Sequence, residues 1–405
     1  MKVTVVGQGY VGLPIAVKAA EAGLFVYGFD IDIKKIQRLK NGYTDSPDIS
    51  RDQLVNLQTS GHLKFTSSLD EVINTKIFVI AVPTPVNSRL EPDHSYLEKA
   101  CQSISKFVSP KTLIINESTS HIGTLRDFIK PIIDSNSGEK DLMYAVAPER
   151  IDPGNLAWSI KNTPRVIAGL DVESARHAFE FYNKFCDQIT IVSKPEIAEA
   201  AKLLENTYRH INIALINELS GIFSSLGIST TEVVKAASTK PFGFTPFFPG
   251  IGVGGHCIPV DPNYLQFSAN NVGVNSKFIK LANEINQSMS KVVIERIERF
   301  LGDTIKNKKI QLVGISYKSN ISDTRESPAI VLMKNLRELG SIVSWHDPLV
   351  REFAGESSSE LDPDIDVGLI LAPHNEIDLT IWERKLTKVL DLSPTFKNYG
   401  WTKFL

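Results

Sequence analysis

Cys257 lies in a segment that is unusual for a cysteine with a purely structural role. The segment FFPGIGVGGHCIPVDP, residues 247–262, is rich in glycine and proline and has neither a helix nor a strand pattern. A small buried cysteine would normally lie in an apolar strand or helix. A thiolate is a strong nucleophile that forms covalent adducts with carbonyl carbon. We therefore favour a nucleophile, with a large, flat ligand lying against the sparse backbone.

Two neighbours of Cys257 bear on its chemistry. Asp261 follows four residues later, and the prolines around it are expected to fix the loop. His256 precedes the cysteine and would lower the pKa of the thiol if its ring lay close in space. Adjacency in sequence does not establish that contact.

Three polar residues recur along the helix predicted for residues 194–227. Lys202 and Asn206 are four apart and Arg209 is seven from Lys202, so all three lie near one helix face. Most such triplets form a solvated stripe. Here apolar positions surround the stripe, and the helix directly follows a predicted cofactor domain. A lysine held beside a substrate hydroxyl can act as a general base or polarise the oxygen.

Glu149 follows the strand predicted for residues 142–148, and Arg150 comes next. A carboxylate at that position could act as a base toward water. An exposed loop acid that pairs with Arg150 fits the spacing equally well. The sequence leaves both interpretations open.

The chain begins with a dinucleotide-binding fingerprint. Gly7, Gly9 and Gly12 have the order G-x-G-x-x-G between a predicted strand and a predicted helix. They would permit a tight turn, close approach of a pyrophosphate to the helix N-terminus, and close helix packing. Asp30 ends the next strand and would bind the adenosine ribose. A carboxylate there repels a 2′-phosphate, which favours NAD over NADP, although Lys35 weakens that preference.

Two threonines follow later strands of the same predicted sheet. Thr84 lies in AVPTP (81–85) and Thr119 in NESTS (116–120). Ligands bind at the carboxyl ends of strands in such folds, so both residues could line the cofactor. Either could instead cap a helix.

A second α/β half begins at Lys309 and has no glycine fingerprint. A charged loop follows its first predicted strand and precedes a helix that begins near Ser327 and Pro328. Lys and Arg suit phosphate oxygens, so we expect a different phosphate-bearing ligand here. Taken alone, the loop would be an ordinary charged connection. Its charged residues are Lys318, Asp323, Arg325 and Glu326.

A base, a thiol and NAD together suit a four-electron oxidation. A lysine and a hydride acceptor convert an alcohol to an aldehyde. A thiol adds to the aldehyde, the adduct loses a second hydride to become a thioester, and water releases the acid. Two NAD would be consumed per substrate.

The predicted elements place these residues in an α/β fold. Two Rossmann-like parallel-sheet domains are joined by a central helical domain with one long helix. Short runs rich in Val and Ile alternate with helix-length segments in both outer parts, which is typical of parallel sheets covered on both faces. A polar surface loop is expected at 354–364. The predicted domains are 1–193, 194–305 and 306–405.

Composition excludes several classes of protein. The 405 residues are 42% hydrophobic and 22% charged, as in soluble globular proteins, and are too many for one ordinary core. A net charge of -2 gives no support for nucleic-acid binding. No apolar run suits a membrane helix or signal peptide. Three cysteines form no disulfide framework, so we expect a cytoplasmic protein with reduced thiols. Cys101 and Cys186 are expected only to pack in the core or near the surface.

These segments together resemble the nucleotide-sugar 6-dehydrogenase family, which includes the UDP-glucose and GDP-mannose dehydrogenases. The resemblance covers essentially the whole chain and is most specific in the cysteine loop and in DTRESPA. It also includes GQGYVGLP, AVPTP, ESTSHIGT, APERIDPGN and AKLLENTYR. The family oxidises the C6 hydroxyl of a sugar nucleotide to a carboxylate with two NAD. Its members are dimers or larger, built on the long central helix, and some sites borrow an arginine from the neighbouring subunit.

The resemblance implies roles for individual residues, and it implies no metal site. The expected catalytic residues are Cys257 as nucleophile, Lys202 and Asn206 at the C6 oxygen, Asp261 assisting them, Glu149 activating water, and Thr119. The expected cofactor-binding residues are Gly7, Gly9, Tyr10, Val11, Gly12, Asp30, Lys35, Thr84, Thr119 and Arg325. The expected substrate-binding residues are Glu149, Arg150, Ile151, Lys202, Asn206, Arg209, Gly254 and Lys318.

Within the family, PERIDPGN and the cysteine loop are most similar to the UDP-N-acetylhexosamine branch. UDP-N-acetylglucosamine is the first expected substrate and UDP-N-acetylmannosamine the second. The segment FGFTPFF, 242–248, is aromatic where glucose-type enzymes have basic residues, which disfavours UDP-glucose.

Two other functions deserve comparison. The β-hydroxyacid dehydrogenases also pair a Rossmann domain with a helix bearing Lys and Asn four apart. They perform one oxidation without a thiol and lack a second α/β domain. A catalytically silent sugar-nucleotide sensor could lose Cys257 or Lys202, and this chain retains both.

Overall fold

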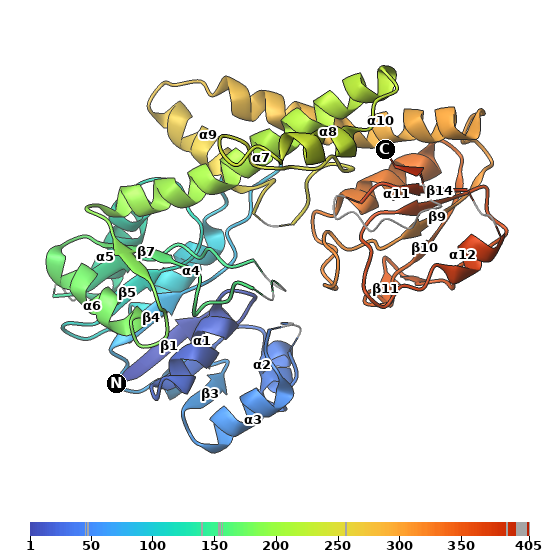
Figure 1. Cartoon of the computed structure of the whole chain (residues 1–405). Helices are drawn as coiled ribbons and strands as arrows, with labels where there is room; N and C mark the ends of the chain where they lie inside the picture. The colour runs from blue at the N-terminus through green and yellow to red at the C-terminus, as the bar shows by residue number, and fades with distance from the viewer. Residues whose placement is uncertain are drawn as a thin grey trace. The chain divides into compact units, whose positions relative to one another are not determined.

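The computed structural model describes residues 1–44, 46, 48–138, 141–152, 155, 157–255, 257–385, 388–393 and 403–404. The chain forms two compact units, each built around its own sheet (Figure 1). Unit 1 consists of Met1–Glu205 and Asn263–Val274, and unit 2 of Asn206–Pro262 and Asn275–Leu405. The central helical segment therefore contributes to both units. Domain boundaries at residues 193 and 305 remain predictions.

Unit 1 contains an eight-stranded sheet with the strand order β3-β2-β1-β4-β5-β6-β7-β8. The strands are β1 (Lys2–Val6), β2 (Phe25–Phe29), β3 (Leu63–Thr66), β4 (Ile77–Ile80), β5 (Leu113–Asn116), β6 (Met143–Val146), β7 (Arg165–Gly169) and β8 (Ile189–Ile191). Neighbours pair in parallel except β6 and β7, which are antiparallel. The described residues between β6 and β7 include no helix that could carry the chain back for a parallel pairing. The expected parallel pairing is therefore wrong only between β6 and β7, and β7 pairs in parallel with β8.

Helices cover both faces of this sheet because alternate strand residues point to opposite sides. Val3 and Val5 of β1 belong to a core cluster that includes side chains of α1, α2, α3 and α6, whereas Val6 belongs to a second cluster with side chains of α4, η2 and α5. These helices are α1 (Gly12–Glu21), α2 (Ile33–Lys40), α3 (Arg51–Thr59), α4 (Ser95–Ile104), α5 (Lys130–Ser137) and α6 (Val172–Tyr182), with a π-helical turn η2 (Leu125–Ile129) and a short 3-10 turn η1 (Leu69–Glu71). The patterns do not predict β3, because this edge strand is short and alternates Lys64 with apolar residues.

Unit 2 contains a parallel sheet with the strand order β10-β9-β13-β14-β15. The strands are β9 (Lys309–Val313), β10 (Ile342–His346), β13 (Val367–Ile370), β14 (Val389–Asp391) and β15 (Lys403–Phe404). One face packs on α10 (Lys277–Leu301) and α11 (Pro328–Glu338), and the other on α12 (Thr380–Lys385). Ser327 caps α11 through the backbone N–H of Ala329, as Pro at the next position favours.

The loop expected at 354–364 contains a strand. Residues Glu356–Ser357 form β12, which pairs antiparallel with β11 (Glu352–Phe353). Gly355, with φ +82°, supplies the tight turn between them. The polar composition that indicates a surface loop is thus equally compatible with a small exposed hairpin.

The long helix α7 (Pro195–Ser225) has an unusual distribution of side chains. Its buried face is mostly polar: Glu199, Lys202, Asn206, Thr207, His210, Asn217 and Ser220. Its exposed face carries an apolar stripe: Ile197, Leu204, Tyr208, Leu215 and Ile222. A helix that only filled a core would show the reverse arrangement.

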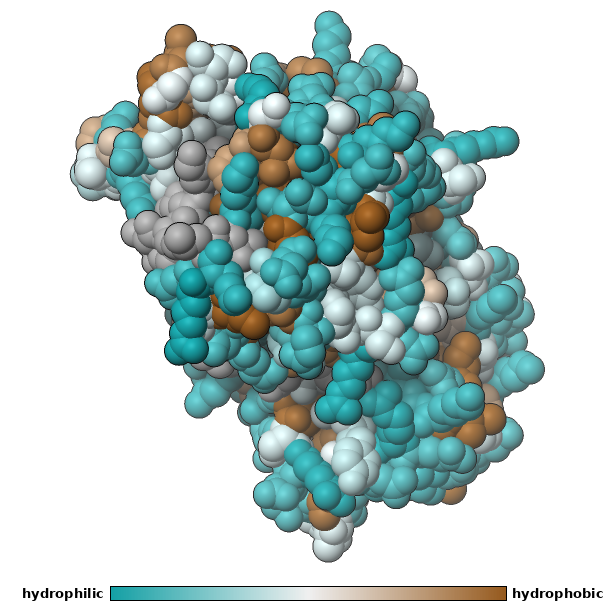
Figure 2. Space-filling view, turned by 90° about the vertical axis from the view of Figure 1, so that its right-hand side faces the viewer, coloured by the Kyte–Doolittle hydropathy of each residue, from teal (hydrophilic) through white to brown (hydrophobic). Residues whose placement is uncertain are grey.

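Over most of the face that Figure 2 displays, hydrophobic residues lie among hydrophilic ones, which is normal for a protein surface. No helix in the described ranges is long and apolar enough to cross a membrane.

Candidate active site

The glycine turn after β1 has the geometry expected of a dinucleotide site. Gly7 has φ +94°, and a Cβ there would lie 2.3 Å from the carbonyl oxygen of Ala81. Gly9 has no heavy atom within 4 Å of the corresponding position, so space is open where a pyrophosphate would approach. The helix α1 begins after Tyr10 and Val11, and no side chain caps it. Its first backbone N–H groups can therefore serve an anion.

Gly12 explains why this turn is so compact. A Cβ at Gly12 would lie 1.9 Å from the carbonyl oxygen of Gly7, so only glycine lets α1 start this close to β1. The three predicted glycines therefore have three different physical roles, and the residues present fit an NAD pyrophosphate.

Asp30 is held at the end of β2 by three hydrogen bonds. The backbone N–H of Gln8 donates to one carboxylate oxygen at 2.9 Å, and that of Asp32 to the other at 3.0 Å. Lys35 Nζ donates to Asp30 Oδ2 at 2.8 Å. The structure therefore places Lys35 on the carboxylate itself, where it orients Asp30 and reduces its negative charge toward a ligand.

The two predicted threonines lie on loops at the same edge of the sheet, after β4 and β5. Ser118, next to Thr119, ties these loops together: its hydroxyl accepts from the N–H of Val82 and donates to the Val82 carbonyl, both at 2.9 Å. The carbonyl of Thr84 accepts from the buried hydroxyl of Tyr264 at 3.1 Å. Tyr264 belongs to α9 (Asp261–Asn271), which the sequence patterns do not predict.

Glu149 is buried together with Lys202. Both residues are 7% exposed. Burial raises the pKa of Glu149, while the positive charge of Lys202 and a hydrogen bond from the N–H of Ile151 act in the opposite direction. Neither residue is part of a solvated stripe. A carboxylate with a raised pKa is a better base, which suits the role expected for Glu149.

Arg150 does not pair with Glu149. Its guanidinium instead forms two hydrogen bonds to the carboxylate of Glu205, at 2.5 and 3.0 Å, and a third at 2.7 Å to the carbonyl of Pro164. The alternative of an exposed acid paired with Arg150 is therefore wrong. These contacts join the loop after β6 to α7, and Arg150 contributes to positioning that loop.

The sequence patterns miss a buried ion pair beside this site. Glu117, at the end of β5, pairs with Arg165 at 2.5 Å, and Tyr182 donates its hydroxyl to the same carboxylate. Burial disfavours the charge on Arg165, but Glu117 raises its pKa above the ordinary value. A buried charge requires such a partner.

Glu199 is a second residue that the patterns miss. It lies on α7, three residues before Lys202, and is buried. Its carboxylate accepts from the N–H groups of Gly123 at 2.6 Å and Leu125 at 3.0 Å, which caps the start of η2. The sequence contains one indication of this role. Glu199 lies three residues before Lys202 on the predicted helix, so the two residues share a helix face.

In unit 2, Asn206 donates from Nδ2 to Asp261 Oδ2 at 2.5 Å, and both residues are buried. Asp261 is the first residue of α9, so the expectation that it lies on a proline-fixed loop is wrong. Because α7 is continuous, Asn206 lies one helical turn after Lys202 on the same face. Arg209, by contrast, is exposed.

Cys257 is the exposed cysteine, whereas Cys101 and Cys186 are buried. Its carbonyl accepts from the N–H of Asp261 at 2.8 Å, so the cysteine directly precedes the first turn of α9. The N-terminal end of a helix favours an anion. His256, which would lower the pKa of the thiol if its ring lay close, lies outside the described residues.

The glycines before Cys257 are explained by packing within the protein. A Cβ on Gly255, which has φ +83°, would lie 2.8 Å from the Tyr317 ring. A Cβ on Gly254 would lie 2.7 Å from Cδ of Pro328 and 2.9 Å from the Glu326 carbonyl oxygen. The Tyr317 ring lies against this backbone at Gly255. The sparse side chains bring the cysteine loop against the charged loop after β9.

Arg325 and Lys318 lie on that charged loop. Arg325 donates from Nε and Nη2 to both oxygens of Asp323, at 2.9 and 2.7 Å. Lys318 is half-buried, and its carbonyl accepts from the Ser316 hydroxyl at 2.8 Å. Among the described residues, no cluster of His, Cys, Asp and Glu side chains could hold a metal ion.

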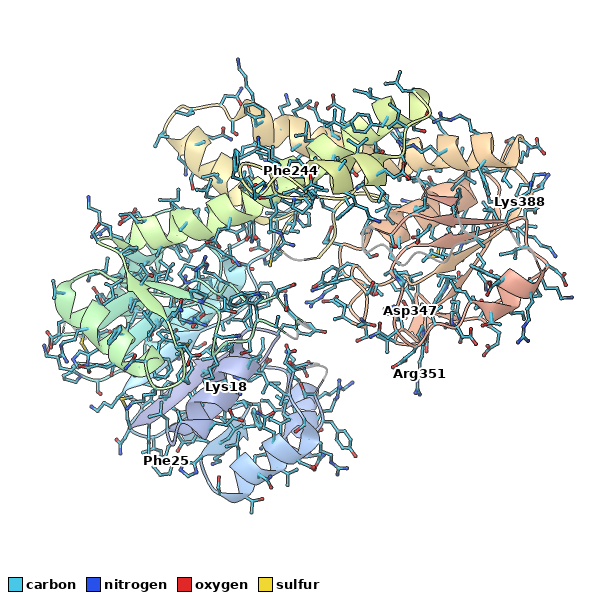
Figure 3. The ribbon with its side chains drawn as sticks, in the orientation of Figure 1. Lys18, Phe25, Phe244, Asp347, Arg351 and Lys388 are labelled. Carbon is cyan, nitrogen blue, oxygen red and sulfur yellow. The ribbon has the colours of Figure 1, made fainter. Side chains whose placement is uncertain are left out.

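The aromatic segment 242–248 is partly exposed. Phe242 and Phe244, the latter labelled in Figure 3, are 70% and 41% exposed. Lys240 Nζ lies 5.0 Å from the centre of the Phe242 ring. Phe247 contacts Tyr208 of α7, with ring centres 5.9 Å apart.

Comparisons with known proteins agree with this geometry. Three domains of the UDP-glucose/GDP-mannose dehydrogenase family match the chain: the NAD binding domain at residues 1–186, the central domain at 196–288 and the UDP binding domain at 311–396.

Individual relatives carry two substrate names. The chain is 34% identical over 86% of its length to UDP-N-acetyl-D-glucosamine 6-dehydrogenase from Pseudomonas aeruginosa, covering 83% of that protein. It is 35% identical over 93% of its length to UDP-N-acetyl-D-mannosamine dehydrogenase from Methanocaldococcus jannaschii, covering 86% of it. The structure of the UDP-D-ManNAc dehydrogenase from Pyrococcus horikoshii matches all of this chain and 99% of that one, with a TM-score of 0.90 and 29% identity. This chain therefore belongs to the UDP-glucose/GDP-mannose dehydrogenase family and is an NAD-dependent nucleotide-sugar dehydrogenase.

Proposed function

We propose that the protein oxidises the C6 hydroxyl of a UDP-N-acetylhexosamine to a carboxylate, with Cys257 as a covalent catalyst. The observation that carries the proposal is the polar buried face of α7. Lys202 lies there with Glu149 close by, and Asn206 follows one turn later, bonded to Asp261. A buried lysine beside a buried carboxylate suits proton transfer at a substrate oxygen, and the Asn206 amide offers a hydrogen-bond donor one turn later on the same helix face.

Each of these residues has its own role in the proposed reaction. NAD, held by the glycine turn and Asp30, accepts a hydride in each of two oxidations when it is bound. Lys202 and Asn206 hold the C6 oxygen, and Lys202 takes or polarises its proton. Cys257 attacks the resulting aldehyde, the adduct is oxidised to a thioester, and a water activated by Glu149 cleaves the C–S bond. Each alcohol consumes two NAD and one water.

The sugar is proposed at the level of the N-acetylhexosamine. Relatives named for UDP-N-acetylglucosamine and for UDP-N-acetylmannosamine are equally similar to the chain, at 34% and 35% identity. UDP-N-acetylglucosamine, the substrate expected first from the sequence, and its C2 epimer are therefore tested side by side. UDP-glucose is the third substrate in the comparison.

The deciding experiment counts reduced coenzyme per sugar consumed. We expect two equivalents of NADH with one of the two UDP-N-acetylhexosamines and slower turnover of UDP-glucose. Cys257→Ser should bind substrate almost normally but form no acid. Cys101→Ser, a change in the core of unit 1, is the matched control and should keep two equivalents. Full turnover by Cys257→Ser would contradict covalent catalysis, and one equivalent in the unmodified protein would indicate a single oxidation.

We also propose that two chains associate through the apolar stripe of α7. Leu204 is 63% exposed and Leu215 51%, in a helix whose buried face is polar. A repeated apolar stripe on one helix is the kind of surface that a second copy covers in a symmetric dimer. The stripe is self-complementary when two copies of α7 pack along each other.

A further inference from the structure

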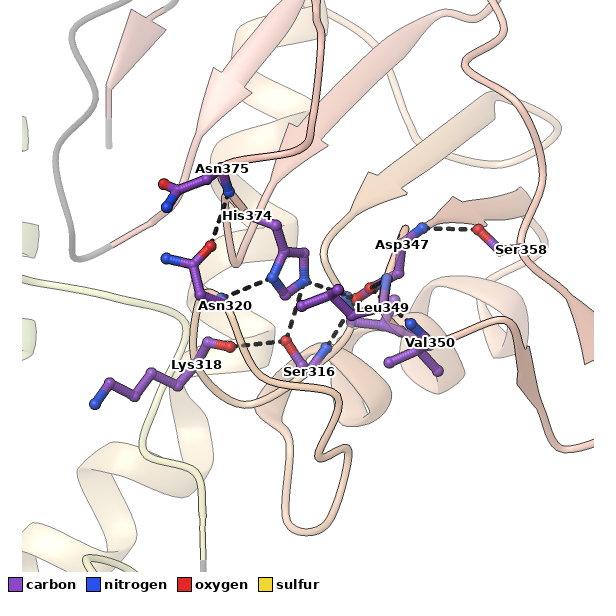
Figure 4. A network of polar contacts seen from close by, with 10 residues as sticks. Ser316, Lys318, Asn320, Asp347, Leu349, Val350, Ser358, His374 and Asn375 are labelled. Carbon is purple, nitrogen blue, oxygen red and sulfur yellow. Dashed lines mark hydrogen bonds and ion pairs between the residues drawn. The ribbon is translucent and has the colours of Figure 1, made fainter. Parts of the chain in front are cut away.

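Three strand ends in unit 2 meet at one buried histidine. His374 follows β13, Asp347 follows β10, and Ser316 follows β9; all three side chains are buried (Figure 4). His374 Nε2 lies 3.1 Å from Asp347 Oδ2 and 3.3 Å from Ser316 Oγ. On the other side of the ring, Nδ1 accepts from the backbone N–H of Asn320 at 2.8 Å.

These contacts fix the state of the imidazole ring. A backbone N–H can only donate, so Nδ1 carries no proton and Nε2 carries one. His374 is therefore neutral, and its single N–H is shared by the Asp347 carboxylate and the Ser316 hydroxyl. The Asp347 carboxylate also accepts from the backbone N–H groups of Ile315 at 2.8 Å and Val350 at 3.0 Å.

This trio differs from a hydrolase triad, although the residue types are the same. In a triad, the acid and the serine contact opposite ring nitrogens. Here both contact Nε2, and the opposite nitrogen is occupied by the backbone of Asn320. The Ser316 hydroxyl donates to the carbonyl of Lys318 at 2.8 Å, so its proton is also committed. The arrangement holds backbone groups in place and activates no nucleophile.

The backbone that it holds is the loop carrying Lys318. Asp347 Oδ2 accepts from the N–H of Ile315 at 2.8 Å. Asn320 has φ +64°, in the left-handed region, and its side-chain oxygen accepts from the N–H of Asn375 at 2.8 Å. Residues 315–320 are thus fastened at both ends and at the middle carbonyl, while the Lys318 side chain extends away from the network (Figure 4).

We propose that His374 is a positioning residue for nucleotide binding: it locks residues 315–320 so that Lys318 is presented to the diphosphate of the nucleotide sugar. The inference rests on the proposed function of this domain in binding UDP. A rigid loop binds an anion without first losing conformational freedom, so holding residues 315–320 in place raises the affinity for the nucleotide. His374 itself touches no ligand.

The first test is binding of UDP alone, measured by calorimetry. His374→Ala should weaken UDP about tenfold or more, the scale expected when a buried polar contact is lost. NAD binding should not change. His374→Asn can replace the Nδ1 acceptor for Asn320, and His374→Gln can replace the Nε2 donor to Asp347. Recovery in one of them identifies the bond that fixes the loop. His346→Gln is the control, because His346 contacts the Ser359 carbonyl instead.

The second test follows the loop without any ligand. Amide hydrogen exchange in residues 315–320 should accelerate in His374→Ala and stay at the normal rate in His346→Gln. If the UDP affinity and the loop exchange rate of His374→Ala both equal those of the unmodified protein, the proposal that His374 positions residues 315–320 is wrong. If the unmodified protein fails to bind UDP while His374→Ala still speeds loop exchange, the proposed nucleotide function fails and the role of His374 in holding the loop stands.

Discussion

Glu117 and Arg165 show how single buried charges support the site. The two residues are 1% and 5% exposed, and they join the end of β5, two residues before Thr119, to the start of β7. Removal of one partner leaves the other charge buried and uncompensated, which typically costs about 3–5 kcal/mol. We expect Arg165→Met to lower the free energy of unfolding of unit 1 by that order, measured by urea unfolding followed by circular dichroism.

The control for this prediction is the double variant Glu117→Gln/Arg165→Met, in which no charge remains. It should be more stable than either single variant, because a buried ion pair can often be replaced by apolar or neutral groups at little cost. Additive losses from the two substitutions would contradict a direct pairing between them.

Asp30 should govern the choice between NAD and NADP. Asp30→Asn keeps the shape of the side chain but loses the charge, and hydrogen bonds to charged groups contribute about 1.5–3 kcal/mol. We therefore expect the KM for NAD to rise about tenfold or more. The KM for NADP should fall relative to it, because Lys35 loses its carboxylate partner and can meet a 2′-phosphate.

Asp32→Asn is the matched control for that change. Asp32 is two residues away and caps α2 by accepting from the N–H of Lys35 at 3.1 Å, a role that Asn fills equally well. Its ratio of KM values should match that of the unmodified protein. Equal coenzyme preference in Asp30→Asn would remove Asp30 from ribose recognition.

At the scale of elements, Glu199 links α7 to η2 and should make that link sensitive to pH. Burial, partly offset by hydrogen bonds from Gly123 and Leu125, raises its pKa from 4.5 to about 7. Because the folded-state pKa is the higher one, the stabilising contribution is complete below about pH 4.5 and is lost as the pH rises through about 7. A pKa change of one corresponds to about 1.4 kcal/mol, so the loss is on the order of 3 kcal/mol.

Glu199→Gln should abolish this dependence, as measured by unfolding free energies between pH 5 and 8. Glu196→Gln is the control on the same helix. Its hydrogen bond with Arg126 lowers the pKa of Glu196, so its contribution changes only at more acidic pH. The same slope in Glu199→Gln and in the unmodified protein would show that another group titrates.

The elements that the sequence predicts well are those with a local signal. The turn at Gly7 depends on contacts within one strand–turn–helix unit, so its motif is readable. The turn at Gly314 has φ +77°, and a Cβ there would meet the Ala372 carbonyl oxygen just as one at Gly7 would meet that of Ala81. Only glycine fits there too, yet no fingerprint follows it.

Residues whose roles depend on distant partners were beyond the sequence patterns. Arg165 meets Glu117 across 48 residues, and Glu199 meets Gly123 across 76. Glu149 is buried and interacts with the charge of Lys202 on α7, which spacing within one loop cannot reveal. The spacing of Lys202 and Asn206 could be predicted because both lie on one helix, whereas the contact of Asn206 with Asp261 required the fold.

At the scale of the whole molecule, the exposed apolar stripe of α7, opposite a mostly polar buried face, predicts how two chains associate. Exposure of Leu, Ile and Tyr side chains to water costs free energy, and association through the stripe removes that apolar area from solvent.

A charge introduced into the stripe would have to be buried without a partner when two chains associate. Leu215→Asp/Ile222→Asp should therefore shift the mass measured by light scattering to that of one chain. Val172→Asp, at an apolar residue 86% exposed on α6, should leave the mass unchanged. A single-chain mass for the unmodified protein, or an oligomer that survives both charges, would place the association elsewhere or exclude it.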